Sequence, residues 1–213
     1  SVGTLLVAIA MMNTLAWAAA LYYLIHSTLI AAAFYLFCGW MTFQRGVFKD
    51  HLKVAPRIKQ QKTAALTYFI IALMMAGLPP FSGFFGKVFI LQATAGTAYQ
   101  AWIIAIILIV SLLSILAFTR VGFILFWRAS PPEDDPNQTA YRTYEALPDR
   151  APKRNDIAIY TILAGLMAYV VFAAPIQRYT FATVQQIQNH ALYNQVILKT
   201  DAQDRAISVQ PFD

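Results

Sequence analysis

The stretch from residue 77 to residue 91, GLPPFSGFFGKVFIL, places two adjacent prolines, three glycines and one lysine inside an apolar segment. Prolines interrupt helices because they lack an N–H group and clash with the preceding turn. A charge inside a membrane is costly, and no acidic residue lies between Asp50 and Glu133 to offset that of Lys87. The stretch therefore predicts a broken helix that carries a functional lysine.

The composition around this stretch is typical of a membrane protein. Hydrophobic residues make up 59% of the 213, and charged residues only 12%, about half the share found in soluble domains. The apolar residues fall in long runs, which predicts an all-α membrane protein, a multi-span helical bundle with one discontinuous helix. The net charge of +6 is concentrated in the loops between these runs, so topology explains it better than nucleic-acid binding does.

The apolar runs divide the chain into expected segments. The run at 64–96 would measure about 50 Å as one helix, against a hydrocarbon core of about 30 Å, so we expect it to break at the prolines. The chain opens in apolar sequence without a methionine, and we expect it to continue a span that begins upstream. The expected segments are a membrane bundle at 1–128 (the end of a span at 1–12, then spans at about 15–43, 64–96 and 101–127), a loop at 129–156, a last span at 157–176, and a surface helix and tail at 177–213.

The loops indicate an orientation. The 44–63 loop carries six basic residues and one acidic residue, and the 129–156 loop ends in three basic residues next to the last span. The excess of positive charge predicts that both loops are cytoplasmic and that the C-terminus lies on the outer side.

The broken helix has an expected course. Pro80 disfavours helical geometry at Pro79, so the first half should end at Leu78–Pro80. Gly83 and Gly86 should allow unusual backbone geometry, with Ser82 between the prolines and these glycines. The second half should then start near residues 85–87.

Lys87 would in that case lie close to the N-terminus of the second half-helix. The partial positive charge there and desolvation both favour the neutral amine, whereas the carbonyl groups that end the first half favour the ammonium. A lysine that can take either form predicts a proton-path site. In the alternative interpretation Lys87 extends to an interface and the prolines only kink the helix.

His26 is the second candidate for the proton path, and five other polar residues in the spans are weaker candidates. Neutral histidine can both donate and accept, so His26 suits a proton relay, with Tyr22 one turn earlier and Thr28 two residues later; a plain hydrogen bond between helices is the alternative. Arg120 does not release its proton in practice, so a structural or field-tuning role is expected. Ser111 and Ser114 are expected to be structural, with water binding as the alternative.

Enzyme signatures are absent from the sequence. It contains no G-x-S-x-G, Walker or H-E-x-x-H motif and no cysteine pair. We therefore expect no catalytic residues, no metal ligands and no cofactor.

Three stretches carry a resemblance to a known family: LYYLIHSTLIAAAFYLFCG at 21–39, GLPPFSGFFGKVFILQA at 77–93 and SLLSILAFTRVGFILFWR at 111–128. Together they resemble the antiporter-like subunits shared by Mrp-type cation/proton antiporters and respiratory complex I, and most closely the D subunit of Mrp/Pha antiporters. The resemblance implies the C-terminal part of a protein with about fourteen spans in two inverted repeats. It implies that Lys87 is the lysine of the broken twelfth helix, and His26 the histidine of helix eleven.

Two positions depart from the family pattern. Many relatives carry a second histidine where this chain has Tyr22, and a lysine where it has Ala31. The proton relay through helix eleven is therefore expected to have fewer protonatable side chains here, or to be filled by water. The glutamate and lysine of the family's first repeat lie upstream of this chain.

Three hypotheses about function follow. The first is a proton-translocating subunit of a multisubunit Na⁺(K⁺)/H⁺ antiporter in the bacterial cell (inner) membrane, with other antiporter subunits as its partners. The second is the equivalent subunit of complex I or of a membrane hydrogenase. The third is a structural membrane scaffold with an inert lysine. No carboxylate lies in these spans to bind Na⁺, so any cation site is expected elsewhere in the complex.

Overall fold

The computed structural model describes residues 1–46, 51–52, 55, 57–128 and 153–189, and within these ranges it contains helices and no strand. The helices are α1 (Val2–Ala10), α2 (Thr14–Gln44), α3 (Gln61–Ala76), α4 (Ser82–Ala93), α5 (Gln100–Gly122) with a π-helical turn η2 (Phe123–Trp127), α7 (Lys153–Val171) and α8 (Ala173–Gln188).

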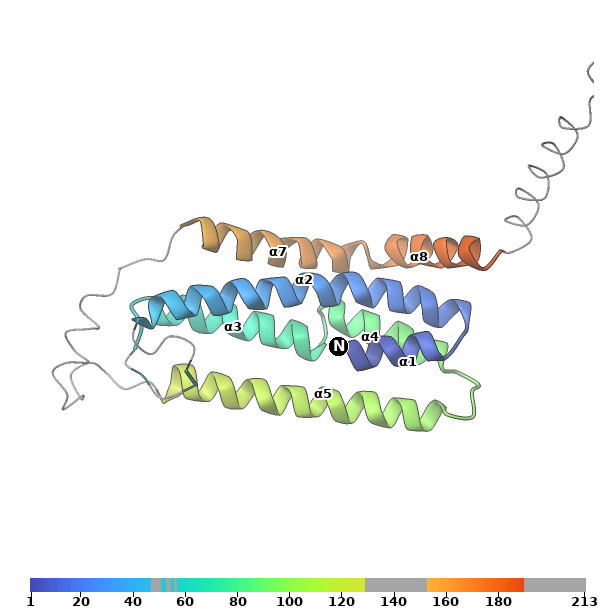
Figure 1. Ribbon diagram of the computed structural model, residues 1–213, viewed down its shortest axis with the longest axis horizontal. Coiled ribbons are helices and arrows are strands. Elements are labelled where there is room, and N and C mark those ends of the chain that lie inside the picture. The colour runs from blue at the N-terminus through green and yellow to red at the C-terminus, as the bar shows by residue number, and fades with distance from the viewer. Residues whose placement is uncertain (47–50, 53–54, 56, 129–152, 190–213) are drawn as a thin grey trace, which may run out of the picture.

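Helix α2 is the axis of the bundle. It contacts α1, α3, α4, α7 and α8, while α5 packs mainly on α3. Figure 1 shows α3 and α4 following one another along one side of α2, with α7 and α8 on the other side and α5 on the far side of α3 and α4. The broken pair therefore lies between the central helix and α5.

Local chemistry explains where α2 begins. Asn13 has an extended backbone, and its side chain accepts a hydrogen bond from the Ala16 N–H at 2.7 Å, as expected of an N-cap. The Asn13 amide also donates to the Ala93 carbonyl at 3.3 Å. The same residue thus starts α2 and ties that end to the end of α4.

The described residues include two helices long and apolar enough to cross a membrane, Thr14–Gln44 and Gln100–Trp127. If the bent pair α7 and α8 counts as one span, the number of membrane-spanning segments rises to three. Helices α3 and α4, at about 24 and 18 Å by helical rise, are each too short alone for a core of about 30 Å. The expected broken span at 64–96 corresponds to these two helices in series.

The break differs in detail from the sequence-based expectation. Helix α3 ends at Ala76, before the prolines, because Gly77 takes the left-handed conformation (φ 76°) and its N–H bonds the Leu73 and Met74 carbonyls. The Leu78 N–H also bonds the Leu73 carbonyl at 3.2 Å. These bonds form a Schellman motif, which a glycine at this position favours.

The second half also starts earlier than expected. After the cis Pro79–Pro80 bond, Phe81 has an extended backbone and occupies the N-cap position of α4. The helix therefore begins at Ser82, not near residues 85–87. Gly83 and Gly86 do not have positive φ values, so the prediction of unusual backbone geometry at them was wrong. Their role is close packing: a Cβ on Gly86 would lie 2.6 Å from the Tyr23 ring of α2.

The last two helices meet at Phe172, not near residue 176 as expected. Pro175 is the reason, because its ring would clash with the Val171 carbonyl four residues earlier if the helix continued. Val171 is the last residue of α7. In α8, Pro175 lies in the first turn, where its missing N–H costs nothing, and the two helices meet at a bend of 79°.

The largest buried cluster of the described residues lies where α3 and α7 pack on the C-terminal half of α2. Large aliphatic side chains of α5 face outward instead, with Leu108, Leu112 and Leu116 each 57% exposed. Such a surface is compatible with lipid or with further protein around the bundle. The core includes Ile30, Phe37, Tyr68, Ile71, Met74, Leu163 and Leu166.

The contact of Gly86 with Tyr23 generates a prediction. We expect Gly86→Ala to destabilise the full-length protein by about 1–3 kcal/mol, because the added methyl must push α2 and α4 apart. Thermal unfolding in detergent measures this loss.

Gly165→Ala is the matched control, since a Cβ at this helical glycine of α7 has nothing within 4 Å. It should be neutral or stabilising by up to about 1 kcal/mol, from helix propensity alone. Equal melting temperatures for the two variants would contradict the close-packing role of Gly86.

Candidate functional site

Lys87 lies in the second turn of α4 and reaches back across the break. Its Nζ donates to the Ala76 carbonyl at 2.6 Å and to the Ser111 hydroxyl at 2.9 Å. Ala76 is the last residue of α3, and Ser111 belongs to α5. One side chain therefore joins both halves of the broken helix to a third helix.

The carbonyl end of α3 sets the electrostatics around the amine. The last carbonyls of a helix have no partner within it and carry partial negative charge. The N-terminus of the second half-helix was expected beside the lysine, but α4 starts five residues earlier, at Ser82. The lysine thus meets the carbonyl end of α3, which favours its charged form.

Gly77 makes room for the lysine stem. A Cβ there would lie 2.8 Å from Lys87 Nζ and 3.0 Å from Cε. Gly77 thus has two functions, since it ends α3 through its left-handed backbone and lets the amine approach the Ala76 carbonyl.

His26 of α2 contacts the same end of α3. It is buried, its Nδ1 lies 2.8 Å from the Ser82 hydroxyl, and the ring also bonds the Met74 backbone. Gly83 permits this approach, because a Cβ there would lie 2.7 Å from His26 Nε2 and 2.6 Å from the Met74 carbonyl. His26 therefore links the last turn of α3 to the first residue of α4.

These bonds assign the tautomer of His26. A carbonyl oxygen only accepts, so Nε2, the nitrogen on the Met74 side, carries the hydrogen. Nδ1 then accepts the hydrogen of the Ser82 hydroxyl. Both ring nitrogens are engaged, and protonation at Nδ1 requires that hydroxyl to turn away.

A cavity of about 270 Å³ lies beside Lys87, between the break and α5. Lys87 and Ser111 are its polar side chains, and its other walls are apolar or backbone. Gly77, Leu78 and Pro79 form the side of the break, whereas Pro80 is exposed and does not line the cavity.

The other expected residues lie outside this site. Thr28 and Ser114 donate to carbonyls of their own helices, those of Leu24 and Val110. Arg120 is exposed in the last turn of α5. None of the three contacts His26 or Lys87 among the described residues.

Tyr22 has a packing environment. It is fully buried, its ring lies 5.1 Å from that of Phe89 and 4.7 Å from that of Tyr169, and its backbone carbonyl accepts from the Tyr169 hydroxyl. Its own hydroxyl has no partner among the described residues. Tyr22 thus packs α2 against α4 and α7.

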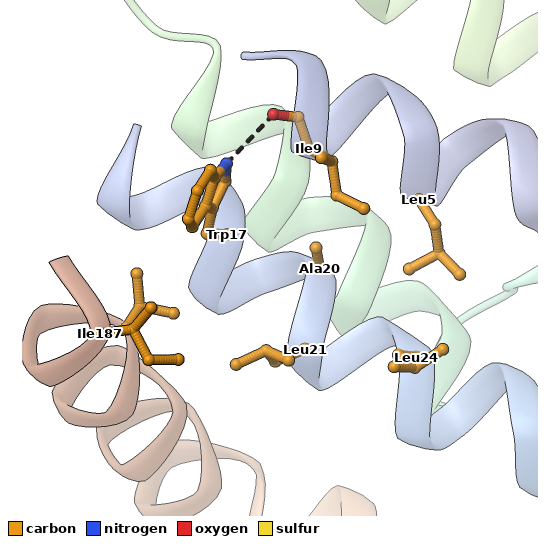
Figure 2. A pocket seen from close by; sticks show the side chains of 8 residues that line it. Leu5, Ile9, Trp17, Ala20, Leu21, Leu24 and Ile187 are labelled. Carbon is orange, nitrogen blue, oxygen red and sulfur yellow. Dashed lines mark hydrogen bonds between the residues drawn. The ribbon is translucent and has the colours of Figure 1, made fainter. Parts of the chain in front are cut away.

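A second, larger cavity of about 310 Å³ lies between α1, α2 and α8. Figure 2 shows its aliphatic lining and the bond from the Trp17 indole N–H to the Ile9 carbonyl, which is 3.1 Å long. No ionisable side chain lines it, so it is not a candidate for proton chemistry.

Sequence reasoning missed the backbone acceptors, and it did not pair Ser111 with Lys87. The Met74 and Ala76 carbonyls leave no mark in residue types, although Gly77 directly before Leu-Pro-Pro is a recognisable helix stop. Ser111 was a possible supporting residue with an expected structural role, and its hydroxyl accepts a bond from Lys87. Within the described part of the chain, no group of three or more His, Cys, Asp or Glu side chains comes together to bind a metal.

Comparisons with known proteins match this chain to antiporter-like subunits. A family model described as NADH:quinone oxidoreductase/Mrp antiporter, TM, matches residues 1–115. The D subunit of a Na⁺/H⁺ antiporter from Alkalihalophilus pseudofirmus is 29% identical over 93% of this chain and 38% of its own length. The protein of the same name from Bacillus subtilis is 33% identical over 69% of this chain and 29% of its own length.

A third relative, from Rhizobium meliloti, is described as the D subunit of a probable K⁺/H⁺ antiporter. It is 28% identical over 60% of this chain and 29% of its own length. The chain thus spans between 29% and 38% of the length of these three relatives.

The contact of Gly77 with the lysine generates a second prediction. Gly77→Ala should destabilise the full-length protein in two ways: by about 1–2 kcal/mol from the left-handed backbone, and further because the methyl displaces Lys87 from the Ala76 carbonyl. Chemical or thermal unfolding measures the sum.

Gly96→Ala separates the two effects. Gly96 has a similar φ of 79°, but a Cβ on it has nothing within 4 Å, so only the backbone strain applies. A loss for Gly77→Ala no larger than that for Gly96→Ala would show that Lys87 does not lie over Gly77.

Proposed function

Because the chain belongs to the NADH:quinone oxidoreductase/Mrp antiporter transmembrane family, we propose that it is part of a proton-translocating subunit of a multisubunit antiporter. The complex exchanges Na⁺ or K⁺ for H⁺. One observation carries the proposal: an amine at the carbonyl end of a broken helix, beside a cavity, with no carboxylate in α2, α3, α4 or α5. The antiporter names of the relatives support it.

Lys87 is the proton carrier in this proposal. As an ammonium it has three N–H groups, two of which bond the Ala76 carbonyl and the Ser111 hydroxyl. The third is free to meet water in the cavity that Lys87 lines. Release of a proton to that water, and its recovery, moves charge between the bundle interior and one side of the membrane.

His26 is the second proton-path residue. It gains a proton at Nδ1 only when the Ser82 hydroxyl turns away, so the start of α4 controls its reactivity. Both residues bond the last turn of α3, His26 at Met74 and Lys87 at Ala76. The broken-helix residues Pro79, Pro80, Ser82, Gly83 and Gly86 maintain this geometry. Ala31 supplies no polar group, so water completes the path on the α2 side.

The partners and orientation belong to the same proposal. The chain works in a hetero-oligomeric complex with other antiporter subunits in a bacterial inner membrane. The basic loop at 44–63 and the loop at 129–156 face the cytoplasm. Figure 1 supports the placement of both loops on one side of the membrane, because the ends of α2, α3, α5 and α7 that border these loops lie at one end of the bundle.

The family also includes subunits of NADH:quinone oxidoreductase. Under that second hypothesis the same lysine and histidine move protons in a complex I or membrane hydrogenase driven by redox energy. The genes beside this one distinguish the two hypotheses. A cluster of small antiporter genes would favour the antiporter, and a set of genes for redox proteins would favour complex I or a membrane hydrogenase.

Lys87 variants test the proposal. In everted vesicles that carry the complete complex, we expect Lys87→Ala to reduce Na⁺- or K⁺-dependent ΔpH changes to the level of vesicles without the complex. Lys87→Arg should fail as well, because arginine keeps the charge but does not release the proton.

Lys62→Ala is the control, since Lys62 is exposed in the first turn of α3. It should retain wild-type exchange. Normal exchange by an assembled Lys87→Ala complex would leave only the scaffold hypothesis.

His26 variants test the relay. His26→Gln can keep both bonds, since an amide donates and accepts, but it cannot carry a proton. We expect it to assemble normally and to lower the exchange rate at least about tenfold, as for loss of a proton-transfer group. His26→Ala should lose exchange or shift its pH profile to acid. An unchanged rate and pH profile for His26→Gln would make His26 a structural bridge.

A further inference from the structure

We propose that Ser111 is a positioning residue for Lys87: its hydroxyl holds the amine on the α5 side of the break so that the lysine can exchange its proton. This inference rests on the proposed role of Lys87. It adds a residue of α5, a helix outside the broken pair, to the proton path.

The Ser111 hydroxyl can act only as an acceptor toward Lys87. Its hydrogen is donated to the Ile107 carbonyl one turn earlier, at 2.7 Å. Its oxygen then faces Lys87 Nζ at 2.9 Å. Lys87 is the donor in this pair, and the bond to a charged group is stronger than a neutral one.

Two acceptors are needed to fix the amine. Lysine has a flexible four-carbon stem and loses much rotamer freedom when it is held in one place. The Ala76 carbonyl alone, at 2.6 Å, leaves the amine free to rotate about one contact. The second contact, with Ser111, comes from another helix and so determines where the third N–H points.

No other polar group of α5 can replace this hydroxyl. Among the described residues, the Lys87–Ser111 bond is the one hydrogen bond that joins α4 to α5. The α5 side of the cavity is otherwise formed by Ile107, Leu108, Leu112 and Ile115. Ser114, one turn later, donates to the Val110 carbonyl and does not line the cavity. Without the Ser111 hydroxyl, the amine faces an apolar wall.

An isosteric pair of substitutions at position 111 tests the proposal in the full-length complex. Ser111→Thr keeps the hydroxyl and its bond to the helix backbone, whereas Ser111→Val has the same shape as the threonine variant without the hydroxyl. We expect Ser111→Val and Ser111→Ala to lower the initial rate of cation-dependent ΔpH change about tenfold or more, as for a lost hydrogen bond to a charged group. Ser111→Thr should stay within about twofold of wild type.

Ser114→Ala is the matched control, because Ser114 makes the same bond to its own helix but has no contact with Lys87. It should behave as wild type. Assembly of each variant is measured by copurification of the complex.

Three outcomes would overturn the proposal. They are wild-type rates for Ser111→Ala and Ser111→Val, equal losses for Ser111→Thr and Ser111→Val, and failure of the Ala and Val variants to assemble while Ser111→Thr assembles. The first means that the hydroxyl is not needed. The second means that the size of the side chain at position 111, not its hydroxyl, sets the rate. The third means that the hydroxyl serves assembly.

Lys87→Ala, measured beside these variants, separates this inference from the function on which it rests. Loss of exchange in Lys87→Ala with normal exchange in Ser111→Ala contradicts only the role of Ser111. Normal exchange in Lys87→Ala contradicts the proton-path function itself.

Discussion

The arrangement of the site depends on one feature of the backbone, the buried carbonyl end of α3. A helix that stops inside a membrane leaves carbonyl groups without partners, and in hydrocarbon such groups are costly. Here the Schellman bonds of Gly77 and Leu78 satisfy Leu73 and Met74, Lys87 satisfies Ala76, and His26 adds a second bond to Met74. The break and the polar side chains therefore stabilise each other.

This mutual dependence explains why helix breakers and a bare positive charge occur in one short stretch. Without the break, the amine would have no backbone acceptor and no cavity. Without the amine, the Ala76 carbonyl would lack this partner. The same bonds leave the proton of the amine exchangeable, because both partners are neutral acceptors and neither is a carboxylate that would stabilise the ammonium permanently.

The helices were largely predictable from the sequence, and the contacts within the site were not. Long apolar runs and the proline pair predicted the helices of residues 1–128 and the existence of a break. The sites where helices end depended on finer signals, Gly77 before the prolines and Pro175 in the first turn of α8. The partners of Lys87 and His26 could not be predicted, because backbone carbonyls are common to all residues and the choice of Ser111 over Ser114 depends on how α5 is rotated against α4.

Chemical rescue at position 87 is the most direct test of the claim that this amine exchanges protons. In a background of the complete complex in which Cys38 and all other reactive cysteines are replaced, Lys87→Cys can be alkylated with 2-bromoethylamine, which rebuilds a lysine-like primary amine, or with its trimethylammonium analogue, which carries a fixed charge. The account predicts that the unmodified cysteine variant is inactive, that the primary amine restores cation-dependent ΔpH formation, and that the quaternary ammonium does not. Equal rescue by the quaternary group would show that charge alone suffices and would contradict proton exchange at Lys87.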